Sequence, residues 1–344
     1  MQSLLCSAEN ALGPACDSTM GDDLADFCAE LSKGNAAKAT ELAKKCDVKG
    51  KTTFDTTAAY YARESVQMVQ LAADLGVDVK APCEPDGTTL AYHARENKQI
   101  LGKLAELGLD LNAPCSVGGT TPLFHCRDNE EMLRHLVSLG ADVNAPCDED
   151  GNTILYHCRE SVASLKLLHE LGANLSAPCH HSGETIAYFA KDELMLDALA
   201  NLGMDLSQPC DKEGNTPLWF AAEPTEDDKT GARLRVLAKH LGAGKLLEPC
   251  CASGTTVAFH CRDSPDFLEL LHSLEVDLTK ACTKAGHSVI FYLVDKFQTL
   301  KRLHTIGVDI TAPVDQEGNT IKDILSEKPD QLEGITRELG ISFA

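Results

Sequence analysis

A seven-residue pattern recurs nine times along the chain. It consists of a cysteine (once replaced by valine), three variable residues, a glycine, one variable residue and then threonine or serine. Successive glycines are 37, 32, 32, 32, 31, 40, 32 and 32 residues apart. A period near 32 predicts a stack of small units, none of which can bury its apolar face alone. The glycines of the pattern are Gly50, Gly87, Gly119, Gly151, Gly183, Gly214, Gly254, Gly286 and Gly318.

One unit, taken over residues 143–175, predicts two helices joined by turns. Residues 143–147 favour an extended chain, and 148–151 form a polar turn that ends in glycine. Thr153 precedes a short helix that its side chain can cap. Ser161 begins a second helix with leucines along one side, and Gly172 stands where such a helix ends. Equivalent glycines end the other second helices, except that Glu275 takes this position once.

The ends of the chain depart from the repeat. Residues 22–33 and 35–45 predict a helix pair, so 22–46 are interpreted as an N-terminal cap, 47–314 as repeats and 315–344 as a C-terminal cap. We therefore expect one solenoid over 22–344 with about ten units and an irregular lead over 1–21. Extra residues near 54–61 and 223–231 are either tolerated surface loops or parts of a binding face.

Short motifs inside the units resemble the ankyrin repeat. Gly119–Leu123 and Gly214–Leu218 both read Gly-x-Thr-Pro-Leu, and 139–145 read Leu-Gly-Ala-Asp-Val-Asn-Ala. The resemblance extends from about residue 22 to the C-terminus and implies an all-α ankyrin-repeat solenoid with short turn or hairpin loops. The chain departs from the family by an added Pro-Cys step before the turn and by aromatic residues where the family has histidine: Tyr92, Phe124, Tyr156, Tyr188, Trp219, Phe259 and Phe291. We expect aromatic packing to replace the family's threonine–histidine bonding.

The charge of the chain limits its partners. The formal net charge is −21, which excludes a nucleic-acid role because phosphate binding needs a basic face. An acidic surface favours basic or mixed-charge protein partners, although it also simply serves solubility. No stretch reaches the roughly 18 apolar residues of a membrane span, so we expect no membrane insertion. No signal peptide is visible, because Leu4-Leu5 lacks a basic lead.

The fifteen cysteines leave several interpretations open. Eight share one repeat position: Cys46, Cys83, Cys115, Cys147, Cys179, Cys210, Cys250 and Cys282. Members of this row should lie about 10 Å apart, too far for the roughly 7 Å between Cα atoms that a disulfide allows. Cys126, Cys158 and Cys261 lie eleven residues after a row member. Each of these three cysteines either forms a disulfide with the row member before it, forms a disulfide with the row member after it, or is a small buried residue with a free thiol, as the row members themselves are expected to be. Cys6 and Cys16 are the best candidates for oxidation.

No catalytic or metal motif stands out from the repeats. His-Cys pairs occur at 125–126, 157–158 and 260–261, but neighbouring side chains on a helix face different ways, and zinc needs converging ligands. Phosphate-binding glycine loops, nucleophile elbows and metalloprotease helices are lacking. We therefore expect no enzyme activity, no cofactor and no metal.

The turns and first helices are the predicted partner-binding surface. Residues that flank the turn glycines change chemistry from unit to unit, as a recognition surface on a rigid frame requires. A second row, six residues after each glycine, either anchors a partner through aromatic rings or packs half-buried between first helices. The predicted contact residues are Asp86, Glu149, Asp150, Asn152, His181, Glu184, Lys212, Glu213, Lys284 and His287 in the turns, and His125, His157, Phe189, Phe220, His260 and Tyr292 in the second row.

These observations predict a non-enzymatic scaffold that grips one folded partner protein, either basic or an enzyme, along its concave face. The cysteine content and overall style resemble exported bacterial ankyrin proteins, some of which protect a cell from its own cell-wall hydrolases, including peptidoglycan endopeptidases. That resemblance implies an immunity or inhibitor protein of the periplasm whose signal peptide is not part of this sequence. The alternative is a cytoplasmic adaptor, or a secreted effector that binds a host protein. A third hypothesis, redox or metal buffering by the cysteine row, predicts bound zinc.

Overall fold

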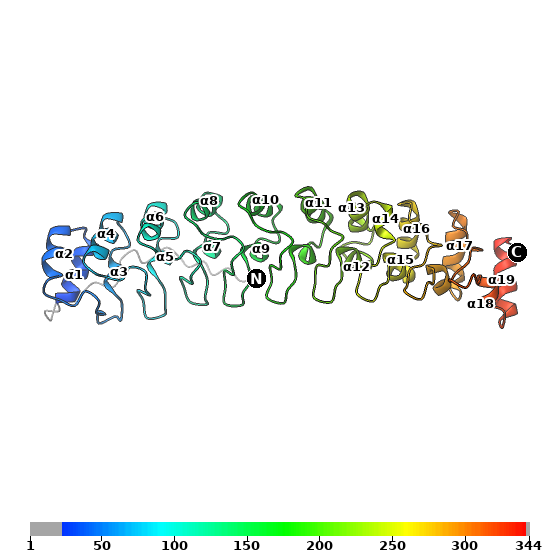
Figure 1. Ribbon diagram of the computed structural model, residues 1–344, viewed down its shortest axis with the longest axis horizontal. Helices are drawn as coiled ribbons and strands as arrows, with labels where there is room; N and C mark the ends of the chain where they lie inside the picture. The colour runs from blue at the N-terminus through cyan, green and yellow to red at the C-terminus, as the bar shows by residue number, and fades with distance from the viewer. Residues whose placement is uncertain (1–22, 342–344) are drawn as a thin grey trace. The chain divides into compact units, whose positions relative to one another are not determined.

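The computed structural model describes residues 23–341, and the predicted lead over 1–21, with Cys6 and Cys16, lies outside them. Two compact units meet at Ile154, and each is described by itself: unit 1 ends there and unit 2 begins at Leu155. Within each unit, short first helices, longer second helices and turn tips form three parallel rows (Figure 1). No strand occurs in residues 23–341, apart from isolated bridges such as Pro82 with Thr89.

Unit 1 contains the predicted N-terminal helix pair and the first repeats. Its helices are α1 (Asp23–Ser32), α2 (Ala36–Leu42), α3 (Ala58–Tyr61), α4 (Val66–Asp74), α5 (Leu90–His93), α6 (Lys98–Glu106), α7 (Pro122–His125) and α8 (Glu130–Ser138). A further helix, α9 (Ile154–His157), stands at the boundary. Glu30 closes the turn between α1 and α2, because its carboxylate accepts hydrogen bonds from Lys33 and Asn35 at 3.1 and 2.8 Å.

Unit 2 continues the alternation of short and long helices. Its helices are α10 (Val162–Glu170), η1 (Ile186–Phe189), α11 (Glu193–Asn201), α12 (Pro217–Ala221), α13 (Ala232–Leu241), α14 (Ala243–Leu246), α15 (Val257–His260), η2 (Cys261–Asp263), α16 (Pro265–Ser273), η3 (Val289–Leu293), α17 (Phe297–Thr305), α18 (Ile321–Ile324) and α19 (Pro329–Leu339). The first helices η1 and η3 are 3-10 helices. None of the helices within residues 23–341 is long and apolar enough to span a bilayer.

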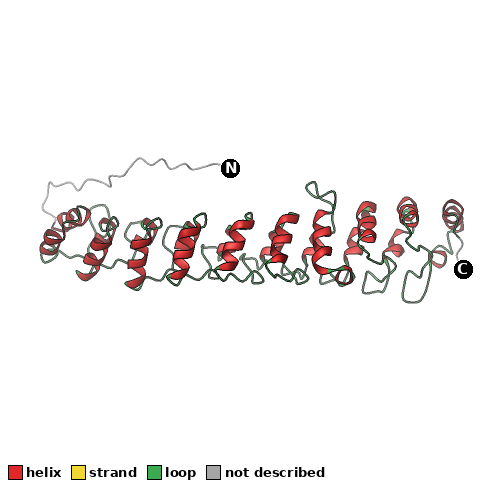
Figure 2. Ribbon diagram, turned by 90° about the horizontal axis from the view of Figure 1, so that it is seen from above, coloured by secondary structure: helices red, strands yellow, loops and turns green. Residues whose placement is uncertain are grey.

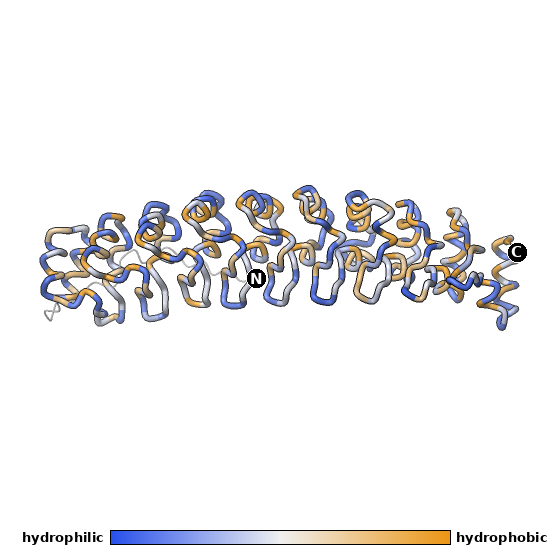
Figure 3. The backbone as a smooth tube through the Cα atoms, in the orientation of Figure 1, coloured by the Kyte–Doolittle hydropathy of each residue, from blue (hydrophilic) through white to orange (hydrophobic). Residues whose placement is uncertain are grey.

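Leucines spaced three residues apart explain why the second helices form and stack. Leu101 and Leu104 of α6, like Leu165 and Leu168 of α10, are fully buried. Burying each such side chain contributes about 1.5–3 kcal/mol. Figure 2 shows the second helices of each unit side by side, and Figure 3 shows apolar stretches recurring along the helices of successive repeats. The core of each unit is therefore a row of thin leucine-rich layers.

Side chains and backbone geometry fix the ends of the second helices. The Asn97 side chain accepts the backbone N–H groups of Gln99 and Ile100 at the start of α6, at 3.1 and 3.2 Å. The predicted glycine stops adopt positive φ, as at Gly140 with 103°. Glu275, the predicted exception, adopts φ 64° at the same position, a conformation that costs a non-glycine residue about 1–2 kcal/mol.

Candidate protein-binding surface

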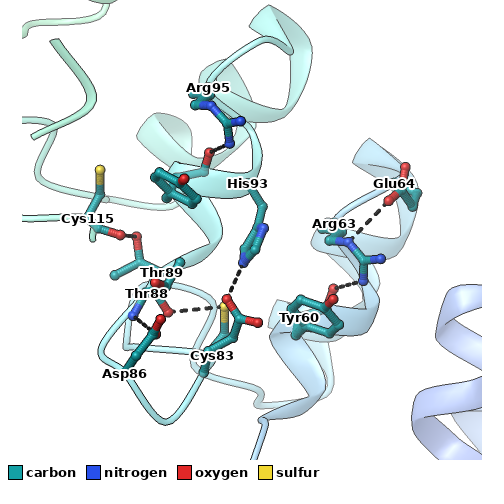
Figure 4. Close-up of polar contacts among 12 residues, drawn as sticks. Tyr60, Arg63, Glu64, Cys83, Asp86, Thr88, Thr89, His93, Arg95 and Cys115 are labelled. Atoms are coloured by element: carbon teal, nitrogen blue, oxygen red, sulfur yellow. Dashed lines mark hydrogen bonds and ion pairs between the residues drawn. The ribbon is translucent and has the colours of Figure 1, made fainter. Parts of the chain in front are cut away.

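The added Pro-Cys step closes each turn and joins it to the preceding repeat. In Figure 4 the Cys83 thiol and its backbone N–H both donate to the Thr88 carbonyl, at 3.4 and 2.8 Å. The backbone N–H and the hydroxyl of Thr89 donate to the carbonyl of Cys115, one repeat later, at 2.9 and 3.2 Å. Thr89 and Thr216 take the position that Thr153 has in its own repeat, but neither side chain caps its own helix, because both hydroxyls donate to the next repeat instead.

The cysteines of the repeat position are buried, apart from half-buried Cys46. Burial raises the pKa of Cys83, Cys115 and Cys282 to about 12. Cys126 and Cys261, which directly follow the first helices α7 and α15, donate to backbone carbonyls of the preceding repeat, Arg95 and Ala222, both at 3.3 Å. These contacts show how small thiols serve the packing of a thin repeat.

Neighbouring turn tips touch one another through their glycines. The Lys212 side chain lies across Gly183, so a Cβ there would stand 2.5 Å from Lys212 Cε, and Lys284 lies across Gly254 in the same way. Both glycines also have positive φ, 95° and 78°. Glycine is therefore required twice over at these positions, for its backbone conformation and for the close approach of the next tip. The tips of unit 2 therefore form a contiguous surface, whereas among the described residues of unit 1 only the tip at Gly119 touches the next one, at Glu149.

The predicted contact residues of the turns fall into two groups. Those at the tip itself are all exposed: Asp86, Glu149, Asp150, His181, Lys212, Glu213 and Lys284. Those directly after the glycine are turned inward. Asn152 is only 3% exposed, and its side chain donates a hydrogen bond to the Asp148 carboxylate at 2.9 Å. The Glu184 carboxylate pairs with His180 at 2.9 Å. The His287 ring stacks on Phe291, with ring centroids 3.9 Å apart. These three side chains hold the turn in shape, and Asn152 is too buried to contact a partner.

The row six residues after each glycine is half-buried in a ladder of rings. Tyr92 meets His125 of the next repeat edge to face, with centroids 4.8 Å apart, and Tyr188 meets Phe220 at 5.1 Å. In unit 2 the same row includes His157, Phe189, His260 and Tyr292, all half-buried. Arginine guanidinium groups lie over several of these aromatic rings, for example Arg95 at 4.5 Å from the Tyr92 centroid. The predicted aromatic packing between repeats is present.

His93 shows what the histidines of this row do. Its Nε2 lies 2.8 Å from a carboxylate oxygen of Glu84, in the turn of the same repeat (Figure 4). His125 takes the equivalent position beside Ser116 and Thr120, at 3.0 and 2.8 Å. Burial, followed by the positive charges of Arg95 and Arg127, lowers the pKa of His125 to about 4. His125 is therefore neutral at physiological pH and connects the turn to the first helix.

Unit 2 contains an aromatic hollow that the sequence analysis did not predict as a binding site. A cavity of about 290 Å³ opens between η1, α12 and the loop over 223–231, and Tyr188, Trp219, Phe220 and Glu223 line it. Tyr188 is 38% exposed, and Leu194 nearby along the chain is 72% exposed. Of the lining residues, only Phe220 was predicted. A sequence signal existed: the chain's one tryptophan stands four residues before the longest insertion, which begins at Glu223.

The insertion that borders this hollow is firmly held. Asp228 is 5% exposed and accepts hydrogen bonds from the backbone N–H of Ala232 at 2.7 Å and from Arg233 Nε at 2.9 Å. Arg233 is itself 8% exposed and lines the hollow. Glu223, Glu226 and Asp227 remain exposed. The loop thus places acidic groups beside an aromatic hollow whose lining also includes Lys191 and Arg233. This combination suits an apolar side chain surrounded by polar groups of both signs.

A second group that sequence analysis missed lies in the turn that begins at Cys250. Cys251 Sγ lies 2.9 Å from the Ser253 hydroxyl, 3.0 Å from the Thr255 hydroxyl and 3.6 Å from His260 Nε2. Partial burial alone would raise the pKa of Cys251, but the hydrogen bonds of Ser253 and Thr255 outweigh it and lower that pKa. The sequence signal was the adjacent Cys250-Cys251 pair, which no other repeat has.

Comparison with known proteins identifies the repeat. Residues 118–148 match the ankyrin repeat family. The crystal structure of the ankyrin repeat domain of Bcl-3, a member of the IκB family, is similar to this chain, with 25% sequence identity and a TM-score of 0.48. The alignment covers 58% of this chain and 93% of the Bcl-3 chain. The complex of the predatory endopeptidase Bd0816 from Bdellovibrio bacteriovorus with immunity protein Bd3460 gives 18% identity, a TM-score of 0.39 and coverage of 48% and 90%. No curated protein sequence matches the chain.

The matched segment is one complete period of the repeat, from the turn at Gly119 through α7 and α8 to the next Pro-Cys step. The same order of turn, short helix and long helix recurs through both units. Ankyrin repeats generally serve as protein-binding scaffolds rather than enzymes. The fold class predicted from the sequence, an all-α ankyrin-repeat solenoid, is confirmed.

Proposed function

We propose that the chain is a non-enzymatic scaffold that binds one folded, basic protein through its turn tips and first helices. The aromatic hollow between η1 and α12, with the acidic loop beside it, carries this proposal. Aromatic side chains in a desolvated pocket are the usual centre of a binding surface, and surrounding charges steer the partner and fix its orientation. The net charge of −21 supports a partner of opposite sign.

We propose further that the partner is a periplasmic cell-wall hydrolase, such as an endopeptidase, and that binding inhibits it. The experiment immobilises the purified chain, passes periplasmic, cytoplasmic and host-cell extracts over it separately and assays the bound protein for peptidoglycan hydrolysis. We expect one basic hydrolase, bound in a 1:1 ratio and inactive until released by salt. A bound hydrolase that retains full activity would contradict the inhibitor role. Recovery of a cytoplasmic or host protein alone would favour the alternative of an adaptor or effector.

Charge reversal at the turn tips tests which surface is used. Asp150 and Lys212 are exposed at tips of unit 1 and unit 2. We expect Asp150→Lys and Lys212→Glu each to weaken the complex about 3- to 10-fold, but in different ways. Asp150→Lys should act mainly through slower association, because it reduces the steering of a basic partner, and Lys212→Glu mainly through faster dissociation, because it removes a contact of the lysine itself. The measurement is surface plasmon resonance at two salt concentrations.

Two further substitutions control for the change in net charge. Glu333→Lys in α19 and Lys166→Glu in α10 make the same charge changes at exposed positions of second helices. We expect their association rates to stay within about twofold of the wild type, since charges beyond a Debye length of about 8 Å are largely screened. Equal losses in all four variants would show that only net charge matters and would remove the turn tips from the proposed surface.

A further inference from the structure

The turn that begins at Cys250 brings together three side chains with metal-binding chemistry. Cys250 and Cys251 supply two thiols, and His260 of α15 supplies an imidazole. Their ligand atoms all lie within 4.8 Å of one another, and Cys251 Sγ is 3.6 Å from His260 Nε2. Within residues 23–341 this is the one group of three or more such side chains that converges so closely.

One of the three separations fits a zinc ion directly, and the other two, of at most 4.8 Å, would shorten by up to about 1 Å on binding. The Cys250 thiol, which donates to the Thr255 carbonyl at 3.4 Å, would turn from that carbonyl to the metal. Zinc bonds sulfur at about 2.3 Å and imidazole nitrogen at about 2.0–2.1 Å in tetrahedral geometry, which places the ligand atoms about 3.5–3.8 Å apart. The separation of Cys251 Sγ from His260 Nε2 already has this value. Two thiolates and one imidazole also form a donor set that zinc prefers to magnesium or calcium, which select oxygen.

The expectation of no metal rested on adjacent His-Cys pairs, and at residues 260 and 261 that reasoning holds. Cys261 points away and donates to the Ala222 carbonyl of the preceding repeat, while His260 faces the turn of its own repeat. The converging sulfurs come instead from the turn, nine and ten residues earlier in the sequence. They meet His260 because the turn folds back on the first helix.

A nearly identical arrangement in unit 1 shows what is special here. Cys115, Ser116, Thr120 and His125 occupy the positions of Cys250, Cys251, Thr255 and His260. The threonine hydroxyl lies 2.8 Å from histidine Nε2 in both turns. The unit 1 turn has a hydroxyl where the unit 2 turn has a thiol, so the second sulfur is the one chemical difference among these four positions.

We propose that Cys250, Cys251 and His260 bind one zinc ion, which leaves the fourth coordination position to solvent. Cys250 is fully buried, whereas Cys251 and His260 are half-buried, so the ion enters from the turn side. Binding displaces the two thiol protons into solvent. The hydroxyls of Ser253 and Thr255, both near Cys251 Sγ, are placed to hydrogen-bond the metal-bound water. The proposed zinc site lies in the row of turns that also forms the proposed partner-binding surface of unit 2.

The experiment titrates the full chain, reduced and stripped of metal, with Zn²⁺ in competition with a chromogenic chelator. Co²⁺ serves as a spectroscopic substitute, because tetrahedral thiolate ligation gives intense visible and sulfur-to-metal charge-transfer absorption. We expect one equivalent of Zn²⁺ per chain. Cys251→Ser should fold like the wild type, because it recreates the Ser116 turn, and should bind Zn²⁺ more than about 100-fold more weakly, since even residues that only orient ligands are worth 10- to 100-fold.

Two more variants make the result specific. His260→Asn should lose the same equivalent, and Ser116→Cys should gain a second one by completing the set with Cys115 and His125. A wild type that binds no Zn²⁺, or a Cys251→Ser variant that binds it as tightly as the wild type, would overturn the proposal. Binding by the other cysteines of the chain would appear as affinity retained in Cys251→Ser and would overturn it as well.

Discussion

Replacing Asp228 by alanine is expected to destabilise unit 2 by about 3–5 kcal/mol, the range measured when one partner of a buried ion pair is removed. The Asp228 carboxylate pairs with Arg233 Nε at 2.9 Å and also accepts the backbone N–H groups of Ala232 and Arg233, at 2.7 and 3.2 Å. Both side chains are nearly buried, at 6% and 9% exposure. Alanine would leave the guanidinium without a counter-charge and the first turn of α13 without its cap.

The chain carries its own probe for this measurement. Trp219 is the one tryptophan of the sequence and lines the same hollow as Arg233, so its fluorescence during urea unfolding reports on this part of unit 2. Asp227→Ala, a neighbouring exposed acid, is the matched control and should shift stability by less than about 0.5 kcal/mol. The double variant Asp228→Ala with Arg233→Met should recover most of the loss, because it removes both charges. Equal midpoints for Asp228→Ala and Asp227→Ala would contradict the role of the pair.

The same pair predicts a pH dependence. Burial alone would raise the pKa of Asp228, but hydrogen bonds from Arg233 and Ala232 outweigh it and hold the folded-state pKa below the ordinary value. The stability that the carboxylate contributes is therefore fully present above its unfolded pKa, about 4, and is lost as the pH falls through the lower folded value. We expect the stability gap between the wild type and Asp228→Asn to be constant at neutral pH and to shrink below about pH 4. A gap that stays constant down to pH 2 would contradict this assignment.

The sequence predicted the fold well because the repeat places the same geometric demand at equal intervals. The recurring glycine adopts positive φ at the turns from Gly87 to Gly318, for example 95° at Gly183, although Gly50 does not. Glycine stops and caps such as Asn97 then fixed the second helices. The role of Thr89 could not be predicted, because its hydroxyl bonds to Cys115, and a local pattern does not show which group of the next repeat lies opposite. The repeat spacing around Ile154 does not differ from that of the neighbouring repeats, so the division into two units could not be predicted from the sequence. The single solenoid over 22–344 stays a prediction.

The candidate surface was harder to predict than the fold because variability between repeats has two causes. Asp150 varies and is exposed, whereas Asn152 varies and is buried against Asp148, since each turn needs its own matched pair to close it. Sequence alone shows both as variable positions. The hollow beside Trp219 depends on how the loop over 223–231 folds back, which follows from the ion pair at Asp228 and not from any period. The predicted contact residues stay predictions until a partner is bound.

Trp219→Ala is expected to weaken binding of the partner protein by about 2 kcal/mol or more, roughly 30-fold, because a half-buried tryptophan beside an open hollow has the features of an interface hot spot. Trp219 lines the cavity of about 290 Å³ together with Tyr188 and Glu223. In the Trp219→Ala variant, a partner side chain in this cavity would no longer contact the indole ring and would no longer be shielded from water by it. The measurement is the dissociation constant, by isothermal titration calorimetry, with the hydrolase recovered on the immobilised chain.

The matched control for Trp219 is Phe259→Ala. Phe259 occupies the same position of the repeat in unit 2, is also half-buried, and meets Tyr292 edge to face at 5.1 Å, but it does not line the hollow. Both truncations remove a ring from the same ladder, so circular dichroism should show similar losses of stability for the two variants. Only Trp219→Ala should lose most of the affinity, and the loss should lie mainly in faster dissociation. If the two variants bind equally well, the hollow is a packing defect beside the insertion, and the partner contacts the turn tips alone.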